Sequence, residues 1–309
     1  MRRSVAPSVL IAAVGLAAVA GGARAQDEEP KVVRIDTLNV RDTLYHLSGG
    51  GRNALALIDE INGGIVLVDA MPPGWSQAVL DAVALVTHLP VTTIINSHAH
   101  AGDASGNAEF EDVTQIVAHE NTGARLEGFA EPDAPGLPTT TFAERFSLLE
   151  DLDRIELYYF GPAHTDGDIV AVFPAKGVAY LGDLFPAKRV PTIDAASGGS
   201  YLAYPDTLAR AAAAIEGVER AITGRTPPPS TYAGRGRRDR REPWTTWQDF
   251  VEYAEFTREF VGAAEAAFEA GRSAAEAAAS LTLAERYAAY DMQRAEAVIE
   301  AIYAELAPR

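Results

Sequence analysis

The chain has 309 residues, of which 48% are hydrophobic and 22% are charged, so it is long enough and apolar enough to bury a full core. Its formal net charge of −17 disfavours nucleic acid and anionic membrane surfaces as partners. The absence of cysteine excludes disulfides, thiolate metal ligands and a lipid-attachment cysteine.

The first 25 residues differ in character from the rest. Arg2 and Arg3 precede an apolar stretch over residues 9–20, and Ala23-Arg24-Ala25 follows it. This order is typical of a secretory signal peptide (residues 1–25), although an uncleaved anchor is the alternative. Cleavage removes three arginines and no acidic residue, which lowers the net charge from −17 to −20. We expect the mature protein to be periplasmic or secreted and free of the membrane.

The first half of the mature chain is rich in short apolar runs. Alternating or continuous apolar residues predict strands over residues 31–42, 53–58, 65–68 and 91–95. The second and third runs are expected to form a β-hairpin or a tight meander, and the third ends at Asp69. A helix is predicted over residues 76–87, with an apolar face made of Leu80, Val83, Ala84 and Val86.

Strands and helices continue to alternate after residue 95. Further strands are predicted over residues 115–118, 155–160, 169–173 and 178–181, with a helix over residues 120–129. Three prolines between residues 131 and 141 indicate a surface excursion. This order of elements predicts an α/β fold, either an αββα sandwich or another layered arrangement.

The composition changes after Arg225. Three prolines and an arginine-rich stretch predict a linker loop over residues 226–243, which divides a main domain at residues 26–225 from a helical extension at residues 244–309. We predict a first helix over residues 244–270. A capping-box pattern, Thr282 with Glu285, introduces a last helix. Its apolar stripe consists of Ala295, Val298, Ile299, Ile302 and Leu306. The extension is expected to pack on the main domain or, in a homodimer, on a second subunit.

Potential metal ligands follow the ends of three predicted strands. His98 and His100 come directly after residues 91–95, and in extended backbone two such side chains point to the same side. His164 follows a second strand, and Asp183 follows a third. Three imidazoles with one open position are the ligand set of a catalytic zinc, which lowers the pKa of bound water to about 7.

The motifs around these residues resemble those of the metallo-β-lactamase superfamily in their order and spacing, from about Tyr45 to Gly224. They are Gly-Ile-Val-Leu-Val-Asp69, Ile-Asn-Ser-His98-Ala-His100, Ser-Gly-Asn107, Gly-Pro-Ala-His164-Thr-Asp-Gly-Asp168 and Leu-Gly-Asp183-Leu-Phe. The resemblance implies an αββα sandwich with its metal site at one edge of the two sheets. It also implies that His98, His100 and His164 bind a first zinc, whereas Asp183 binds or bridges to a second.

Asp69 would then order the metal loop from beneath, without being a ligand. Asp166 and Asp168 are interpreted as turn formers that fix the His164 loop. Among the other histidines, His119 is interpreted as a hydrogen-bonded structural residue. His46 and His88 are interpreted as surface or packing residues.

The second metal site departs from the family pattern, whose loop usually reads His-x-His-x-Asp-His. Aligned without a gap, Gly102 stands at the aspartate and Asp103 at the third histidine; with one inserted residue, Asp103 recovers the aspartate position. A late histidine, expected near Gly224-Arg225, is also missing. We therefore expect one zinc per chain. Arg225 supplies fixed positive charge there, pairing with Asp183 or with a substrate anion, unless it is a surface arginine.

Two classes of function agree with these residues. The first is a mononuclear zinc hydrolase of a small-molecule ester, amide, lactam or lactone, in which Asp103 or Asp183 orients the attacking water or carries its proton. The alternative is a non-catalytic or weakly active envelope binding protein, which the lost second-site ligands favour. A di-iron redox protein is disfavoured, because such a site needs the full ligand set.

Overall fold

The computed structural model describes residues 31–38, 43–131, 134–226 and 244–307. The predicted signal peptide, and all of the predicted linker except Thr226, lie outside these residues. Within the described segments, no helix is long and apolar enough to cross a membrane.

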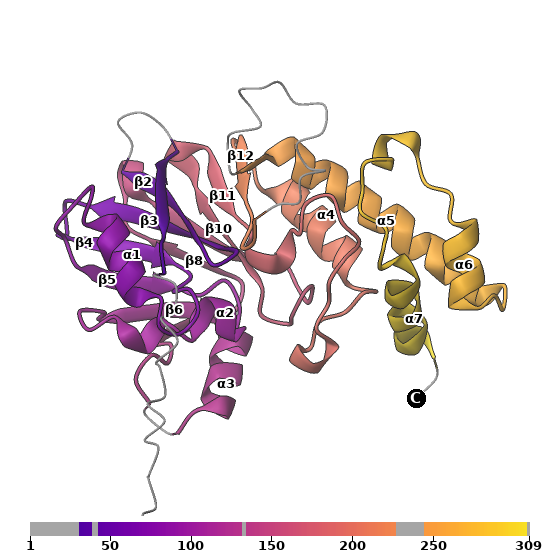
Figure 1. Cartoon of the computed structure of the whole chain (residues 1–309), viewed down its shortest axis with the longest axis horizontal. Coiled ribbons are helices and arrows are strands. Elements are labelled where there is room, and N and C mark those ends of the chain that lie inside the picture. Colours follow the sequence, from indigo (N-terminus) through magenta and orange to yellow (C-terminus); the bar gives the residue numbers. More distant parts are fainter. Residues whose placement is uncertain (1–30, 39–42, 132–133, 227–243, 308–309) are drawn as a thin grey trace, which may run out of the picture. The chain divides into compact units, whose positions relative to one another are not determined.

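The first sheet has seven strands that follow one another in chain order (Figure 1). They are β1 (Arg34–Thr37), β2 (Leu44–Gly49), β3 (Arg52–Asp59), β4 (Gly64–Val68), β5 (Val91–Ile95), β6 (Gln115–His119) and β7 (Thr140–Phe142). Pairing is antiparallel from β1 to β4 and parallel from β4 to β7. Parallel neighbours need crossover connections, and α1 (Ser76–Val83) and α3 (Glu120–Phe129) supply two of them.

The second sheet has six strands in the order β13-β12-β11-β10-β9-β8. They are β8 (Arg145–Leu148), β9 (Ile155–Tyr159), β10 (Ile169–Phe173), β11 (Val178–Tyr180), β12 (Arg220–Ile222) and β13 (Thr245–Thr246). Only β11 and β12 pair in parallel, and α4 (Tyr204–Ala214) connects them. Since β13 comes after the predicted linker, the second sheet is completed by residues that we assigned to the extension; the domain boundaries themselves stay a prediction.

The two sheets pack face to face because their strands alternate two apolar faces. In β4, Val66 and Val68 join the core between the sheets, whereas Ile65 and Leu67 join the core under α1. The opposite sheet behaves in the same way, with one set of residues facing the first sheet and the other facing helices α4 and α5 (Trp247–Glu269). Such strands are buried on both faces, which is why they read as continuous apolar runs in the sequence.

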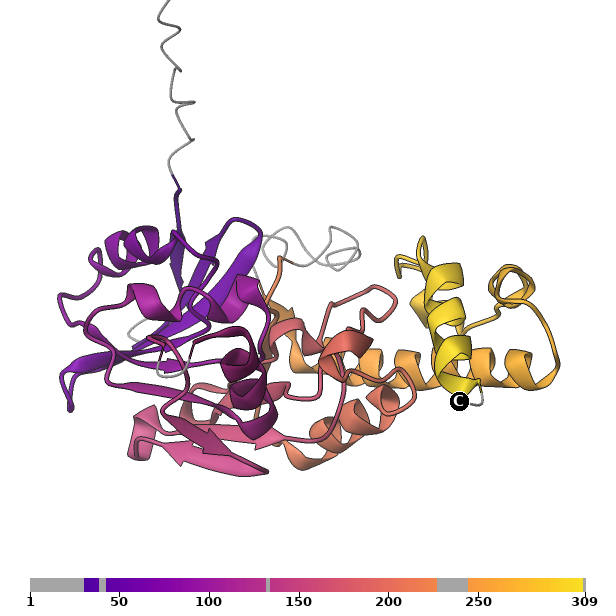
Figure 2. The ribbon, with the colours of Figure 1, turned by 90° about the horizontal axis from the view of Figure 1, so that it is seen from below.

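Helices cover both outer faces, so the predicted αββα sandwich is confirmed. The C-terminal helices are α5 (Trp247–Glu269), α6 (Ala274–Ser280) and α7 (Ala295–Leu306). The long helix α5 packs against α4 at one end and against α6 and α7 towards the other (Figure 2). One continuous core joins the second sheet to α4 and all three C-terminal helices.

Two local predictions were wrong. Helix α1 ends at Val83, and it buries Ala78, Val79, Ala82 and Val83, while Leu80 stays 36% exposed. Two apolar stripes compete in this helix, and the one that is buried contains Ala78 and Ala82. The segment with Leu85 and Val86 follows the C-cap and lies on the surface.

The predicted capping box at Thr282 and Glu285 is absent, because the hydroxyl of Thr282 donates to the Ser280 carbonyl and Glu285 only opens a 3₁₀ turn. The last helix begins ten residues later, at Ala295. Capping boxes instead start the two preceding helices, through Thr246 with Asp249 and Ser273 with Glu276.

Candidate metal centre

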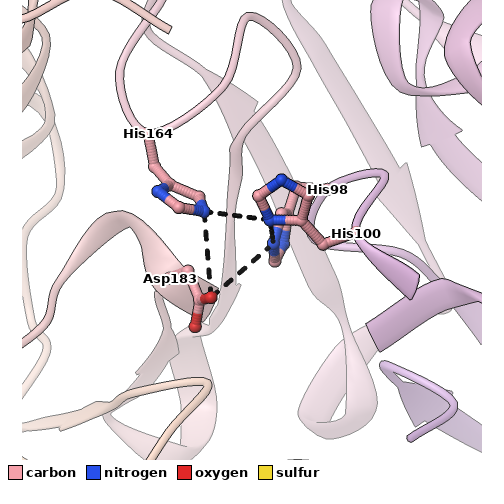
Figure 3. A group of neighbouring side chains, drawn as sticks. All are labelled: His98, His100, His164 and Asp183. Atoms are coloured by element: carbon pink, nitrogen blue, oxygen red, sulfur yellow. Dashed lines mark hydrogen bonds and ion pairs between the residues drawn. The ribbon is translucent and has the colours of Figure 1, made fainter. Parts of the chain in front are cut away.

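Loops from both sheets meet at one edge of the sandwich. His98 and His100 follow β5, His164 lies between β9 and β10, and Asp183 follows β11. The backbone ties the loops together there, since the amide of Ile169 donates to the carbonyl of Ser97 over 3.0 Å. The four predicted ligands point towards one another (Figure 3).

The spacing of the inward atoms fits a metal ion. His100 Nδ1 lies 3.1 Å from His98 Nε2 and 3.1 Å from His164 Nε2. Asp183 Oδ2 lies 3.9 Å from His98 Nε2 and 3.8 Å from His164 Nε2. A tetrahedral zinc with Zn–N bonds of about 2.0–2.1 Å separates its ligand atoms by about 3.3 Å. These four residues therefore form a set that could hold zinc with little movement.

The outward nitrogen of each imidazole is held by a hydrogen bond. His164 Nδ1 donates to the carbonyl of Thr192 over 2.6 Å, and His100 Nε2 donates to the Asp194 carboxylate over 2.8 Å. His98 Nδ1 lies 3.0 Å from the hydroxyl of Ser97. Because that hydroxyl donates to Asp69, it must accept from His98.

Each outward nitrogen thus carries the proton, and each inward nitrogen presents a lone pair to the centre. Burial lowers the pKa of both His98 and His164, which keeps these imidazoles in the neutral form that binds metals. The protein thereby fixes the tautomers that a metal requires.

Asp69 lies below the first histidine and is not among the residues whose atoms converge on the centre. Its carboxylate accepts from the Ser97 amide at 2.8 Å, the Ser97 hydroxyl at 2.7 Å and the Tyr180 hydroxyl at 2.8 Å. Burial raises the pKa of Asp69 to about 6, and these three donors oppose that rise. The residue orders the loop that carries His98.

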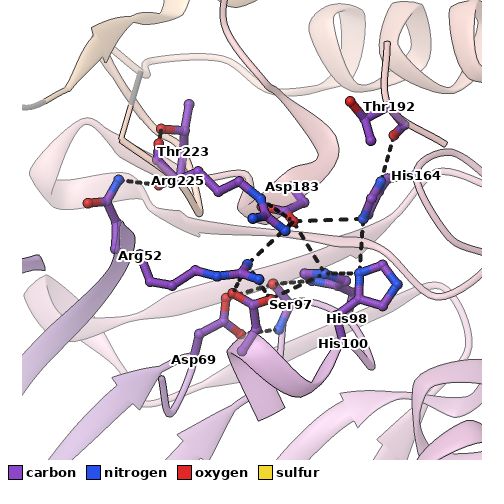
Figure 4. Close-up of polar contacts among 12 residues, drawn as sticks. Arg52, Asp69, Ser97, His98, His100, His164, Asp183, Thr192, Thr223 and Arg225 are labelled. Atoms are coloured by element: carbon purple, nitrogen blue, oxygen red, sulfur yellow. Dashed lines mark hydrogen bonds and ion pairs between the residues drawn. The ribbon is translucent and has the colours of Figure 1, made fainter. Parts of the chain in front are cut away.

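Arg52, which sequence reasoning missed, lies beside the three histidines (Figure 4). Its Nη1 atom is 2.9 Å and 2.7 Å from the two oxygens of Asp103, and 3.4 Å from Asp183 Oδ2. The Arg52 side chain is 14% exposed and that of Asp103 is 1% exposed. Burial, together with Asp69 and Asp183, raises the pKa of Asp103, and Arg52 acts against it.

Arg225 approaches the same centre from β12. Its Nε and Nη2 atoms lie 2.8 Å and 2.7 Å from Asp183 Oδ2. Burial alone would raise the pKa of Asp183, but His98, His164 and Arg225 outweigh it and lower the pKa to about 2. The Asp183–Arg225 contact considered from sequence is present, whereas a substrate role for Arg225 stays a prediction.

Gly102 makes room for the guanidinium of Arg52. A Cβ atom at Gly102 would overlap with Arg52 Nη2. An arginine tip can normally swing away from such a contact, but this one is held by Asp103 and Asp183. Gly102 is therefore matched to an arginine that lies fifty positions earlier in the chain.

The remaining candidates lie outside the centre. His119 is structural: its Nε2 donates to the Ala143 carbonyl over 2.8 Å, and its ring stacks on Tyr159. His46 is buried and meets Trp244 edge-on, while His88 is exposed. The His164 loop is fixed by two carboxylates, since Asp168 accepts from the Thr165 amide and Asp166 pairs with Arg125.

Asp194 was also missed, because no motif surrounds it in the sequence. It closes a short 3₁₀ turn by accepting from the amides of Ala196 and Ser197, which leaves its other oxygen for His100. An aspartate beside Ala-Ala-Ser-Gly reads as an ordinary turn former. Only the fold brings it to a histidine 94 positions away.

Solved structures share the fold. A metallo-beta-lactamase from Pontibacter korlensis superposes with a TM-score of 0.57 at 15% identity, covering 73% of this chain and 99% of that one. The metallo-beta-lactamase DIM-1 gives a TM-score of 0.55 at 16% identity, over 74% and 97%. FIM-1 from Pseudomonas aeruginosa, in a mono-zinc form, gives 0.55 at 12%, over 74% and 95%. At these identities the likeness concerns the fold alone.

Sequence comparison adds one partial relative and one family. The 1D-myo-inositol 2-acetamido-2-deoxy-alpha-D-glucopyranoside deacetylase of Corynebacterium diphtheriae is 30% identical over 108 residues, which are 33% of this chain and 35% of that relative. The chain thus spans about a third of the relative's length. The family model described as the metallo-beta-lactamase superfamily matches residues 49–249, more than half of the chain. With the αββα sandwich and the histidine cluster at its edge, this match shows that the chain belongs to the metallo-β-lactamase superfamily.

Proposed function

We propose that the protein is a hydrolase that binds one zinc ion per chain through His98, His100 and His164. The observation that carries the proposal is the set of three inward lone pairs, each fixed by a hydrogen bond on the opposite ring nitrogen. A zinc ion bound there supplies a Lewis acid and water of lowered pKa. The substrates proposed are small molecules with an ester, amide, lactam or lactone bond.

The positions of two guanidinium groups argue for one metal ion per chain and against two. In the family a second metal neutralises the carboxylates of this region, and here Arg52 and Arg225 contact Asp103 and Asp183 instead. Arginine stays charged at any working pH, so this positive charge is permanent. A second divalent ion beside two guanidinium groups would meet repulsion from both.

Asp183 is the better candidate to hold the nucleophilic water by accepting a hydrogen bond from it, because a carboxylate with a pKa of about 2 is too weak a base to take its proton. Its Oδ2 atom lies 3.9 Å and 3.8 Å from the inward nitrogens of His98 and His164, and its Oδ1 atom has no hydrogen-bond partner among the described residues. Asp103, by contrast, has both oxygens occupied by Arg52. We assign Asp103 the role of positioning Arg52, in place of the water-orienting role considered from sequence.

Metal content per chain is the first test. The mature protein, produced without a histidine tag or chelator, is expected to contain one zinc by elemental analysis and to lose it in His164→Ala. His88→Ala removes an exposed histidine and should keep the metal, which makes it the matched control. Circular dichroism of each variant checks that the fold persists.

Hydrolysis is then measured on ester, lactone, lactam and N-acetyl amide substrates. The amide is included because the partial relative is named a deacetylase. If zinc offered in excess does not bind, the hydrolase proposal fails, and the lost second-site ligands then favour an envelope binding protein. Export is tested separately, by locating the mature protein in the periplasm or medium and sequencing its N-terminus.

A further inference from the structure

A pocket of about 290 Å³ opens directly beside the histidine cluster. His164 and Asp183 form part of its wall, and three arginines complete it: Arg189, Arg225 and Arg294. Three guanidinium groups around one small cavity are unexpected in a chain whose formal net charge is −17. The pocket is therefore a local concentration of positive charge.

The positive charge of the pocket exceeds its negative charge. Asp183 is already paired with both Arg225 and Arg52. Within the described residues, no carboxylate forms an ion pair with Arg189 or Arg294, and Arg189 Nε is buried without a hydrogen-bond partner. The charges of Arg189 and Arg294 are therefore not neutralised by a carboxylate among the described residues, and the pocket keeps a net positive charge.

The C-terminal extension supplies one of these arginines. Arg294 is the residue before α7 and lies outside the matched family region, residues 49–249. The backbone fixes it near the pocket, because the Val190 amide donates to the Asp291 carbonyl over 3.2 Å and the Asp291 amide donates to the Lys188 carbonyl over 3.0 Å. The helices beyond the sandwich thus help to build the site.

The opposite side of the cluster has a different character. A cavity of about 610 Å³ begins at His100 and is lined largely by small and apolar side chains, among them Leu126 and Phe129. Among the described residues on its wall, only Asp194 is charged, and its negative charge disfavours an anion. An anionic group and an uncharged group on one substrate would therefore prefer different cavities, the first beside His164 and the second beside His100.

We propose that the arginine pocket binds an oxyanion, a carboxylate or phosphate group, carried by the substrate next to the bond that is cleaved. Arg189 and Arg294 hold this group, and Arg294 makes the C-terminal extension a determinant of specificity. Arginine recognises such oxyanions with paired, charge-assisted hydrogen bonds. The prediction for turnover rests on the hydrolase function proposed above, whereas the prediction for anion binding does not.

Anion binding is tested first, with glutarate and phenyl phosphate as probes in isothermal titration calorimetry. The zinc-loaded protein and the metal-free protein are both titrated, so that binding to the metal is told apart from binding to the arginines. The variants are Arg189→Gln and Arg294→Gln. Arg258→Gln is the matched control, since Arg258 is an exposed arginine of α5 that does not line the pocket.

Each pocket variant is expected to weaken binding about tenfold, the usual size of a lost hydrogen bond to a charged group, while the control matches the wild type. A preference for glutarate assigns the site to carboxylates, and the reverse preference assigns it to phosphates. Equal binding in all four proteins, or no binding by the wild type at 10 mM probe, overturns the proposal.

Turnover is tested with a matched pair of substrates. One is the mono-4-nitrophenyl ester of glutarate, which carries a free carboxylate, and the other is the same compound with that carboxylate masked as a methyl ester. Arg294→Gln should raise KM about tenfold for the charged ester only. If neither ester is hydrolysed but the anions still bind through Arg189 and Arg294, the hydrolase proposal is in difficulty and the pocket stands. If both esters react equally and no anion binds, the hydrolase stands and the pocket proposal is wrong.

Discussion

The centre contains two adjacent regions that solve the same electrostatic problem differently. At the histidine cluster, neutral imidazoles with fixed tautomers converge and leave a place for a cation. Beside it, Asp103 and Asp183 already have their cations, because Arg52 and Arg225 reach them. The comparison teaches that one set of loops can place a cluster able to hold a cation next to carboxylates that are already paired with arginines. Four changes test how far these regions differ.

The largest effect is expected from removing an imidazole. In His98→Ala, zinc binding should be lost, and hydrolysis should fall by at least about 10³-fold, because a metal Lewis acid contributes several kcal/mol to the transition state. Metal analysis and kcat/KM measure the two consequences. A variant that keeps full activity without bound metal would rule out the three-histidine site.

Removing an arginine that pairs with the buried carboxylates should lower the stability of the fold. Arg52→Met leaves Asp103 buried without its partner, and we expect a loss of about 3–5 kcal/mol in the free energy of unfolding. Arg145 pairs with Glu156, and the Arg145 side chain is 59% exposed. Arg145→Met should therefore lower the free energy of unfolding by about 1 kcal/mol or less. Urea denaturation of both variants gives the comparison. Equal losses would mean that Arg52 is an ordinary surface pair.

His46 is a buried imidazole that lies outside the centre, so it shows what burial alone does to a histidine of this protein. Burial lowers the pKa of His46 to about 4, below its ordinary value of 6.5. The unfolded chain therefore takes up a proton first, and stability should fall as the pH drops from 6.5 towards 4, by roughly 3 kcal/mol in all. His46→Leu should lack this loss. If unfolding of the two proteins depends on pH in the same way, His46 is not buried as described.

The smallest effect concerns the hydrogen bond behind His100. Asp194→Asn should weaken zinc binding about 10–100-fold while the three ligands remain, because the carboxylate fixes the ring and raises its basicity. Asp153→Asn loses an ion pair with Lys176 before the start of β9, at the other end of that strand from the His164 loop, and should leave zinc affinity unchanged. Competition with a zinc chelator measures both variants. A wild-type affinity in Asp194→Asn would show that this contact does not order the ring.

The sequence predicted the sandwich and the location of the histidine cluster because both depend on local patterns. The runs around Val66 and Val170 alternate between two apolar faces, and His98, His100, His164 and Asp183 each follow a strand end. Arg52 was missed because it follows a glycine turn and meets Asp103 only across the first sheet. The only hint in the sequence was the absence of the second-site histidines, which suggests that another cation replaces them. That hint led to Arg225 and not to Arg52.

Errors in the helices have a similar origin. Local patterns at Leu80 and at Thr282 each matched a rule for helical faces or caps. Packing decided otherwise, because the stripe of α1 that contains Ala78 and Ala82 is the buried one and the last helix begins where its apolar stripe begins. Rules of this kind identify candidates, and tertiary contacts select among them.

The overlap between Gly102 and Arg52 constrains how this protein could have changed over time. An aspartate at position 102 would displace the guanidinium from two carboxylates, so it is harmful while Arg52 is present. Loss of Arg52 alone is harmful as well, because Asp103 is then left unpaired. Neither single step towards a two-metal site is favourable on its own. Positions 52 and 102 are therefore coupled, and a change at either one is tolerated only together with a matching change at the other.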